Sequence, residues 1–249
     1  MLSAKLSENV GINKKRGIFK LMISAVIAAA GLGLRMDANL NKLYMKIGNM
    51  PILAISIKAF QNCDSIDEIV VVVRKEDINY CENEIVKKYG YNKVKKIIEG
   101  GKSRQKSVYN GLKELNCDCG IVLIHDGARP FITDRIILEN INTAKNFNAA
   151  CTAVPVKDTV KKSNKDNFVI ETLERQNLWA VQTPQTFMFC TILDAHEIAI
   201  KDGFEGTDDA ILVERMDMPV KLVMGDYNNI KITTPEDLII AEKIMQKRL

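Results

Sequence analysis

The chain has 249 residues and 47% hydrophobic residues, enough for one large hydrophobic core. Its formal net charge is +4, but residues 1–22 hold five basic residues and one acidic residue, so the remaining 30 basic and 30 acidic residues balance. A neutral body argues against a nucleic-acid partner. The chain after residue 22 has no run of about 18 apolar residues, so no membrane span is predicted.

The first 21 residues are predicted to be a disordered basic extension, followed by one domain over residues 22–249. A charged stretch before an apolar run also fits a secretory signal, but cleavage there would remove a predicted strand and a glycine loop. The six cysteines are scattered along the chain, and only Cys117 and Cys119 lie close together in sequence. This pattern favours reduced thiols over a zinc site and predicts a cytoplasmic protein.

Short apolar runs alternate with helical patterns after residue 22. The runs are apolar at nearly every position, as in a parallel sheet that is covered on both faces. We therefore predict an α/β fold with a doubly wound, mostly parallel sheet, which is a Rossmann-like arrangement. The expected strands are Ile23–Ala29, Glu68–Val73, Val94–Ile98, Gly120–Ile124, Ala149–Pro155 and Val220–Met224, and the expected helices are Pro51–Gln61, Ile78–Lys88, Ser103–Leu115 and Asp134–Phe147.

Residues 156–179 break this alternation. They have no helical period, and the turn-forming sequence "SNKDN" lies between Val160 and Val169–Ile170. We predict a β-hairpin arm over residues 156–178 that protrudes from the sheet. Because an isolated hairpin is only marginally stable, a second subunit is its simplest partner, which predicts a homodimer.

A glycine-rich turn follows the first predicted strand. Gly31 and Gly33 allow backbone N–H groups to approach an anion, and Arg35 adds a guanidinium that suits phosphate oxygens. Lys42 is a second cation seven residues later. The turn lacks the third glycine of a dinucleotide fingerprint, where Met36 stands, and the Gly-Lys-Ser/Thr of a P-loop.

A second candidate group follows the apolar run "IVLI". His125, Asp126 and Arg129 come at the carboxyl end of this strand, where open parallel sheets bind ligands. An ion pair between Asp126 and Arg129 with a purely structural role is the alternative interpretation. His125 has no serine or cysteine partner at a recognisable spacing, so we expect it to pack or to hydrogen-bond rather than to act as a base.

Four further segments carry candidate residues with ordinary structural alternatives. In "EGGKSRQKSV", Ser103 is a predicted N-cap, and Arg104 and Ser107 lie on the first helical turns. Thr207 is expected to cap a helix over Asp208 and Asp209. The other two segments are "QTPQTF", residues 182–187, which also reads as a turn, and Lys231, which precedes a helix capped by Thr234, Pro235 and Asp237.

Together these residues resemble one family, the cytidylyltransferases that act on 2-C-methyl-D-erythritol 4-phosphate in non-mevalonate isoprenoid synthesis. The resemblance runs from about Ile23 to Met245. It rests on seven motifs in the family's order and spacing: "AAAGLGLRM", "GGKSRQKSV", "HDGARPF", "PVKDTV", "LWAVQTPQTF", "GTDDA" and "NIKITTPEDL".

The resemblance implies transfer of CMP from CTP to the methylerythritol phosphate, with release of pyrophosphate. It implies catalytic cations at Arg35, Lys42 and Lys231, and a homodimer in which the arm completes the neighbouring site. Mg²⁺, or another divalent cation, would be held mainly by the CTP phosphates, with no certain protein ligand. The implied CTP contacts are Ala29, Ala30, Gly31, Gly33, Gly101, Ser107 and Asp126, and the implied substrate contacts are Asp126, Arg129, Thr159, Arg175, Thr183 and Thr207.

Two other functions remain open at this point. A ribitol-5-phosphate cytidylyltransferase would have the same fold and chemistry, and an inactive nucleotide-binding regulatory homologue would keep the fold alone. The chain departs from the family around the loop lysine, where Asn41 and Leu43 replace the usual proline and glutamine. It departs again at Lys102, where some members have an acid.

Overall fold

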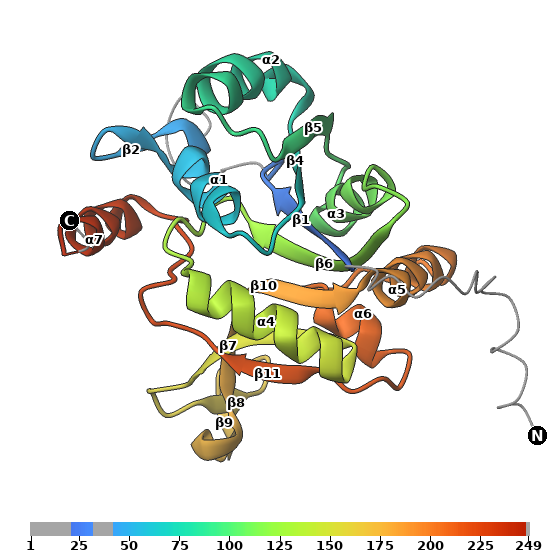
Figure 1. The fold of residues 1–249 in the computed structure, drawn as a ribbon. Helices are drawn as coiled ribbons and strands as arrows, with labels where there is room; N and C mark the ends of the chain where they lie inside the picture. The colour runs from blue at the N-terminus through green and yellow to red at the C-terminus, as the bar shows by residue number, and fades with distance from the viewer. Residues whose placement is uncertain (1–20, 32–41, 248–249) are drawn as a thin grey trace, which may run out of the picture.

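A computed structural model describes residues 21–31 and 42–247. Its centre is a seven-stranded sheet in the order β11-β7-β10-β6-β1-β4-β5 (Figure 1). β10 runs antiparallel to both of its neighbours, and the other four pairs of adjacent strands are parallel. The strands are β1 Met22–Ala28, β4 Glu68–Val73, β5 Val94–Glu99, β6 Cys119–Asp126, β7 Ala149–Pro155, β10 Trp179–Met188 and β11 Lys221–Met224.

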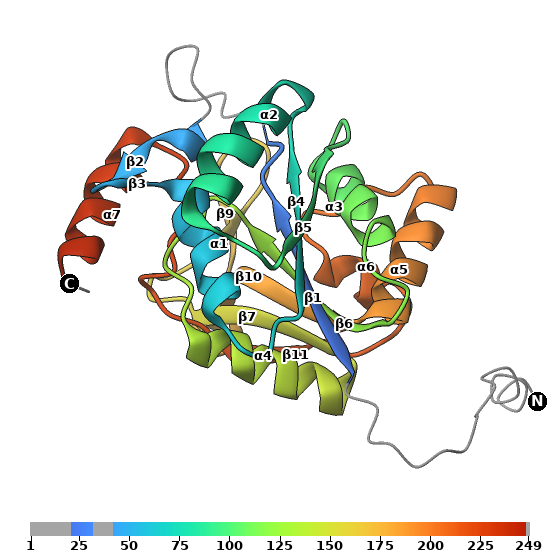
Figure 2. The same ribbon diagram turned by 45° about the horizontal axis from the view of Figure 1, so that its top comes forward.

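Helices cover both faces of this sheet, as the doubly wound prediction requires (Figure 2). One hydrophobic cluster lies beneath α1, α4 and the 81–87 π-helix, and a second cluster lies beneath α3, α5 and α6. The helices are α1 Ile52–Asn62, α2 Ile78–Tyr80, α3 Arg104–Lys113, α4 Asp134–Phe147, α5 Phe189–Lys201, α6 Ala210–Glu214 and α7 Pro235–Gln246; the shorter turns are η1 Lys42–Tyr44, η2 Lys75–Asp77, η3 Cys81–Lys87 and η4 Arg175–Asn177.

The central strands have the two-sided burial that their apolar sequences predict. All six residues of β4 are buried, as are all residues of β6 except Gly120. β1 pairs with β4 on one side and β6 on the other, so their carboxyl ends finish at the same edge of the sheet. The loops that carry the predicted site therefore leave the sheet side by side.

The last helix begins as its sequence predicts. Thr234 and Asp237 form a capping box, and Pro235 is the first helical residue. Hydrogen bonds from Thr233 and Thr234 lower the pKa of the Asp237 carboxyl, although burial opposes the shift. α7 contacts the small sheet of β2 Lys46–Ile47 and β3 Met50–Pro51, beside α1.

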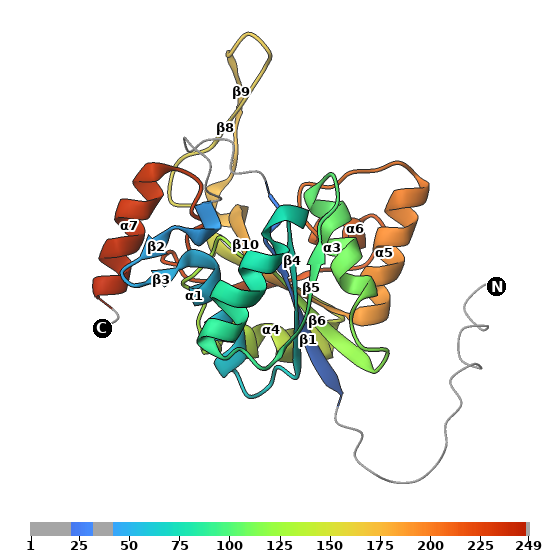
Figure 3. The same ribbon diagram turned by 90° about the horizontal axis from the view of Figure 1, so that it is seen from above.

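Residues 156–178 contain an antiparallel strand pair, β8 Lys161–Ser163 and β9 Val169–Thr172. The pair stands away from the body of the molecule (Figure 3). Phe168, Val169 and Ile170 near its tip are all at least 60% exposed. No subunit partner is part of this structure, so the dimerisation role of the arm stays a prediction.

Two of the longer elements, β10 and α5, were not predicted, and both follow the arm. Residues 182–187 belong to the buried strand β10 rather than to a turn, and the Thr183–Pro184 peptide bond is cis. The register of β10 against β7 shifts between Val181 and Gln185, so Pro184 lies where the ladder is interrupted. A polar segment that contains a proline is not typical of a central strand, so β10 was not predicted. The helix that follows it, α5, was not predicted either.

The predicted extension over residues 1–21 falls almost wholly outside the described residues. β1, which a signal-type cleavage would remove, is one of the central strands.

Leu123 offers a test of this core. Its side chain is fully buried in β6, so Leu123→Ala should lower the free energy of unfolding by about 2–5 kcal/mol through lost burial and a cavity. Leu138→Ala is the matched control, because Leu138 on α4 is 41% exposed and should change stability by about 0.5 kcal/mol or less. Urea unfolding of both variants measures the difference, and equal losses would contradict this description of the core.

Candidate active site

A pocket of about 660 Å³ opens at the carboxyl ends of β1, β4, β5 and β6. Eight of the predicted site residues line it: Ala29, Ala30, Gly31, Lys42, Gly101, Ser107, Asp126 and Lys231. Its other lining residues are Ala28, Leu43, Arg74, Lys75, Glu76, Glu99, Gly100, Lys102, Ser103, Arg104 and Ala128. Gly33 and Arg35 lie outside the described residues.

The wall made by the first loop is held by backbone hydrogen bonds. Ala29 N–H donates to the Val72 carbonyl at 2.7 Å, and Gly127 N–H donates to the Ala28 carbonyl at 2.9 Å. Gly100 packs directly on this loop, since a Cβ at position 100 would lie 2.3 Å from the Ala30 Cβ. Only glycine allows the two loops to approach so closely.

The Gly100-Gly101 loop is joined to the start of α3 by two serines. Ser103 is the N-cap, as predicted, and its Oγ accepts a hydrogen bond from Lys106 N–H at 3.2 Å. Ser107 Oγ accepts from Gly101 N–H at 3.0 Å and donates to the Ser103 carbonyl at 2.8 Å. These contacts give the polar wall of the pocket a defined shape.

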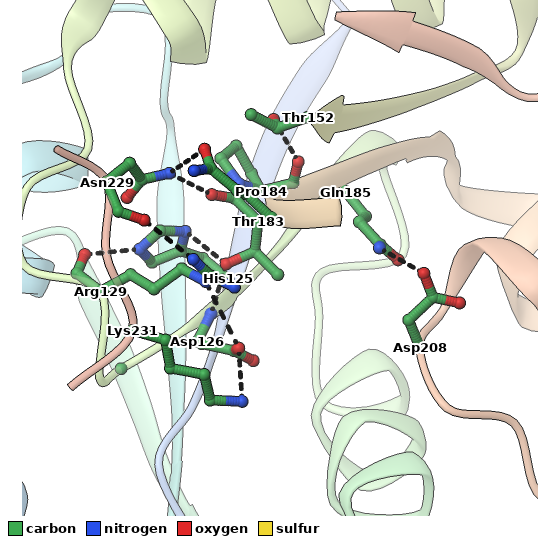
Figure 4. A network of polar contacts seen from close by, with 12 residues as sticks. His125, Asp126, Arg129, Thr152, Thr183, Pro184, Gln185, Asp208, Asn229 and Lys231 are labelled. Atoms are coloured by element: carbon green, nitrogen blue, oxygen red, sulfur yellow. Dashed lines mark hydrogen bonds and ion pairs between the residues drawn. The ribbon is translucent and has the colours of Figure 1, made fainter. Parts of the chain in front are cut away.

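Asp126 is the centre of a charged cluster in the pocket wall. Its Oδ2 lies 2.8 Å from Lys231 Nζ and 3.7 Å from Arg129 Nε (Figure 4). Its Oδ1 lies 3.1 Å from Arg104 Nε. Burial alone would raise the pKa of this carboxyl, but Arg104, Lys231 and Arg129 together hold it well below its usual range. Asp126 is therefore negatively charged at neutral pH and contacts three cations.

Arg104 also pairs with a second buried carboxylate. Arg104 Nη2 lies 2.8 Å from Oδ2 of Asp209, whose side chain is 1% exposed. Although burial opposes it, the combined field of Asp209 and Asp126 raises the pKa of Arg104. The sequence placed Arg104 only on the first helical turns. The only sequence signal for its contacts was the presence of acidic residues in "GTDDA" and "HDGARPF" that could pair with an arginine.

A short hydrogen-bond chain fixes the backbone of Asp126. Asp126 N–H donates to Thr183 Oγ1 at 3.0 Å, Thr183 Oγ1 lies 3.1 Å from His125 Nδ1, and His125 Nε2 lies 3.0 Å from the Arg129 carbonyl (Figure 4). A carbonyl can only accept, so Nε2 carries the proton and Nδ1 accepts from the Thr183 hydroxyl. His125 is thus a neutral hydrogen-bonding residue, which agrees with the prediction.

Asn229 connects the residues that flank Asp126. Its carbonyl accepts from Arg129 Nη1 at 2.8 Å, and its side-chain amide donates to the Thr183 carbonyl at 2.9 Å. Arg129 is largely buried, and burial lowers its pKa even though Asp126 opposes the shift. Because Lys231 follows two residues later in the same segment, Asn229 also places that segment beside β10.

Thr207 does not cap the helix, which corrects that prediction. α6 begins at Ala210, and Asp208 Oδ1 accepts from Ile211 N–H at 3.1 Å instead. Gln185 also caps the first turn of α6, because its Oε1 accepts hydrogen bonds from the Asp209 and Ala210 N–H groups, each at 2.9 Å. Thr207 itself is exposed and does not line the pocket.

The remaining predicted substrate contacts lie apart from the pocket lining. Thr159 and Arg175 are exposed at the base of the arm, where Arg175 Nη1 donates to the Lys157 carbonyl at 2.9 Å. Arg129 and Thr183 contact Asp126 but do not line the pocket. One subunit therefore brings together the predicted nucleotide contacts more completely than the predicted contacts to the second substrate.

The described residues contain no group of three or more His, Cys, Asp or Glu side chains that could hold a metal ion. Asp126 lines the pocket but is already surrounded by cations. The described protein donors therefore do not fit a resident metal, and Mg²⁺ stays a prediction for the nucleotide itself.

Comparisons with known proteins identify the family of this chain. A family model for IspD, 2-C-methyl-D-erythritol 4-phosphate cytidylyltransferase, matches residues 23–247. The chain belongs to this family. A curated relative of that name from Caldanaerobacter subterraneus is 52% identical over 225 residues, covering 90% of this chain and 99% of the relative. Another from Clostridioides difficile is 51% identical over 229 residues, covering 91% and 96%.

Solved structures show the same fold. The 4-diphosphocytidyl-2C-methyl-D-erythritol synthase of Anaerococcus prevotii has a TM-score of 0.83 and 37% identity, covering 91% of this chain and 97% of that one. The Thermus thermophilus 2-C-methyl-D-erythritol 4-phosphate cytidylyltransferase has a TM-score of 0.74 and 31% identity, covering 90% and 99%. The predicted family resemblance, the Rossmann-like nucleotidyltransferase fold and the enzyme class are confirmed. In the part of the chain that the structure describes, no helix has the length and apolar character to cross a membrane.

The two histidines of the chain predict an acid-dependent loss of stability. Burial lowers the pKa of both His125 and His196 to about 4, compared with about 6.5 in an unfolded chain. Between these values the unfolded chain binds more protons, so the free energy of unfolding should decrease as the pH falls from 6.5 towards 4. Between pH 7 and 5 we expect a loss of about 2–4 kcal/mol for the two together.

Urea unfolding at several pH values measures this slope. His125→Gln together with His196→Gln should flatten the slope, whatever the absolute stability of the double variant. An unchanged slope would contradict the assignment.

Proposed function

We propose that this chain transfers CMP from CTP to 2-C-methyl-D-erythritol 4-phosphate, giving 4-diphosphocytidyl-2-C-methyl-D-erythritol and pyrophosphate. Family membership over residues 23–247 supports the reaction. The relatives and structures described above carry the methylerythritol name, which favours this substrate over ribitol 5-phosphate. The observation that carries the proposal is the cation cluster around Asp126 beside a glycine-lined pocket.

The reaction needs charge stabilisation more than proton transfer. A phosphate oxygen of the methylerythritol phosphate forms a bond to the α-phosphorus of CTP, while the bond from that phosphorus to the bridging oxygen breaks and pyrophosphate leaves. The attacking oxygen is already anionic, so no general base is required. Both reactants are negatively charged, and fixed cations lower the barrier by stabilising the charge of the transition state.

The proposed roles follow from this requirement. Backbone N–H groups around Ala29 to Gly33 cradle the triphosphate, with Arg35 and Lys42 as its cations. Gly101 and Ser107 contact the cytidine. Lys231 stabilises charge at the α-phosphate, and Asp126, whose pKa is held well below the usual range, orients Lys231 rather than exchanging a proton.

Mg²⁺ enters this proposal as part of the substrate, bound by the CTP phosphates. When bound it would neutralise phosphate charge.

We further propose a cytoplasmic homodimer in which the arm of one subunit completes the site of its partner. Thr159 and Arg175 at the arm base would then join Arg129, Thr183 and Thr207 in binding the methylerythritol phosphate. The exposed apolar residues of the arm support this proposal, because Phe168, Val169 and Ile170 would be covered by a second subunit.

Pyrophosphate release tests the substrate. With CTP and Mg²⁺, we expect release with 2-C-methyl-D-erythritol 4-phosphate and little with ribitol 5-phosphate. Release only with ribitol 5-phosphate would overturn the substrate and leave the mechanism. Release with neither would support the inactive homologue. The sequence argues against that outcome, because Arg35, Lys42 and Lys231 are all present.

Removing a loop cation tests the mechanism. Arg35→Ala or Lys42→Ala should lower kcat by about 10²- to 10⁴-fold, because each removes a fixed charge from the transition state. Lys96→Ala is the control, since Lys96 forms a surface ion pair with Glu114 at 2.8 Å and should leave turnover unchanged. Near-normal turnover in the loop variants would contradict the assigned roles.

Mixing two inactive variants tests the shared site. If the arm acts on the neighbouring subunit, a heterodimer of Lys42→Ala and Arg175→Ala has one site with both defects and one intact site. An equimolar, fully exchanged mixture should therefore recover about a quarter of wild-type activity. Recovery should be absent when each subunit uses its own arm, and the unmixed variants provide the baseline.

A further inference from the structure

Arg104 is the one charged side chain of the Asp126 cluster that the proposed function leaves without a task. It reaches Asp126 from α3 and contacts Oδ1, whereas Lys231, from the segment before α7, contacts Oδ2. Neither the predicted helix nor the family resemblance of the chain assigned a role to Arg104. Its two contacts show what it does.

The guanidinium links two carboxylates that come from distant parts of the chain. Nε lies 3.1 Å from Asp126 Oδ1 at the end of β6, and Nη2 lies 2.8 Å from Asp209 Oδ2 at the start of α6. A planar guanidinium can hold two carboxylates in one geometry, which a lysine ammonium cannot do equally well. Asp209 is in turn held by its backbone N–H, which donates to Gln185 Oε1 at 2.9 Å.

The division of contacts on Asp126 matters for the pocket. Arg104 takes Oδ1, which leaves Oδ2 for Lys231 at 2.8 Å and for Arg129 at 3.7 Å. Without Arg104, the carboxylate could rotate about its own bond and pair with Lys231 through either oxygen. The position of the Lys231 ammonium would then be less well defined.

We propose that Arg104 is a positioning residue that, anchored on Asp209, fixes the Asp126 carboxylate so that its second oxygen directs Lys231 toward the reacting phosphate. This inference rests on the proposed cytidylyl transfer for its last step only. The arrangement of Arg104, Asp126 and Asp209 itself does not depend on the substrate.

A purely structural role is the competing explanation, and it makes a different prediction. Asp209 is buried, so Arg104 could serve only to neutralise it. In that case, Arg104→Gln would impair the protein through the unpaired Asp209, and adding Asp209→Asn would restore both stability and activity. If Arg104 positions Asp126, the second substitution restores stability alone.

The experiment therefore compares wild type, Arg104→Gln, Arg104→Lys and the double variant Arg104→Gln/Asp209→Asn. Thermal unfolding reports the fold, and kcat and KM for CTP report the site. Arg215→Gln is the matched control, because Arg215 forms an exposed ion pair with Asp202 at 3.2 Å, away from the pocket lining.

We expect the double variant to unfold near the wild-type temperature yet to lose about 100-fold in kcat, with a smaller change in KM, because a cation is misplaced in the transition state. Arg104→Lys should keep part of the activity. Arg215→Gln should match wild type. Wild-type kcat in the double variant would overturn the proposal.

The charge of Asp126 gives a readout that needs no turnover. Arg104, Lys231 and Arg129 all contact Asp126, and His125 precedes it in β6. Asp209, just before α6, contacts Arg104, and His196 on α5 lies 3.8 Å from Asp209. Removing Arg104 removes one of three cations, so the pKa of the Asp126 carboxyl should rise toward its ordinary value.

A measurement without substrate separates this inference from the proposed function. If wild type releases no pyrophosphate, the function is wrong, but ¹³C NMR of the aspartate carboxyls can still follow Asp126 in the ligand-free protein. A higher pKa in the double variant than in wild type supports the coupling to Arg104. An unchanged titration overturns it.

Discussion

The buried, negatively charged carboxylate of Asp126 determines how the rest of the site is built. Burial works against its charge, and the chain compensates with Arg104, Lys231 and Arg129, which reach it from α3, the segment before α7 and the loop after β6. Each of these cations is drawn into place by the same anion. The site is therefore an electrostatic arrangement in which the negative charge positions the positive ones.

The sheet explains why this arrangement can be rigid. β1, β4 and β6 end at one edge, and backbone hydrogen bonds connect the loops that follow them, such as Gly127 N–H to the Ala28 carbonyl at 2.9 Å. The interrupted strand β10 then brings Thr183 to the backbone of Asp126 at 3.0 Å. A reaction that depends on placing two anionic substrates together benefits from a frame that moves little.

Several parts of the molecule could be predicted from local sequence patterns. The all-apolar strands β4 and β6, the Ser103 N-cap and the Thr234–Asp237 capping box depend on residues that lie within a few positions of each other. The family resemblance rested on seven motifs in the family's order and spacing along the chain. β10 was missed because its polar residues are buried by partners far away in sequence, among them Asp208 for Gln185.

The sequence by itself determined the α/β class, the glycine loops and the identity of the charged residues, because periodicity and motif spacing are local properties. Only the tertiary structure decided which charges meet. Arg104 pairs with Asp126 and Asp209, and Lys231 reaches back to Asp126 from the other end of the chain. Such pairs depend on the order of strands in the sheet and on which charged side chains are buried away from water. Neither can be predicted from the residues that are neighbours in sequence.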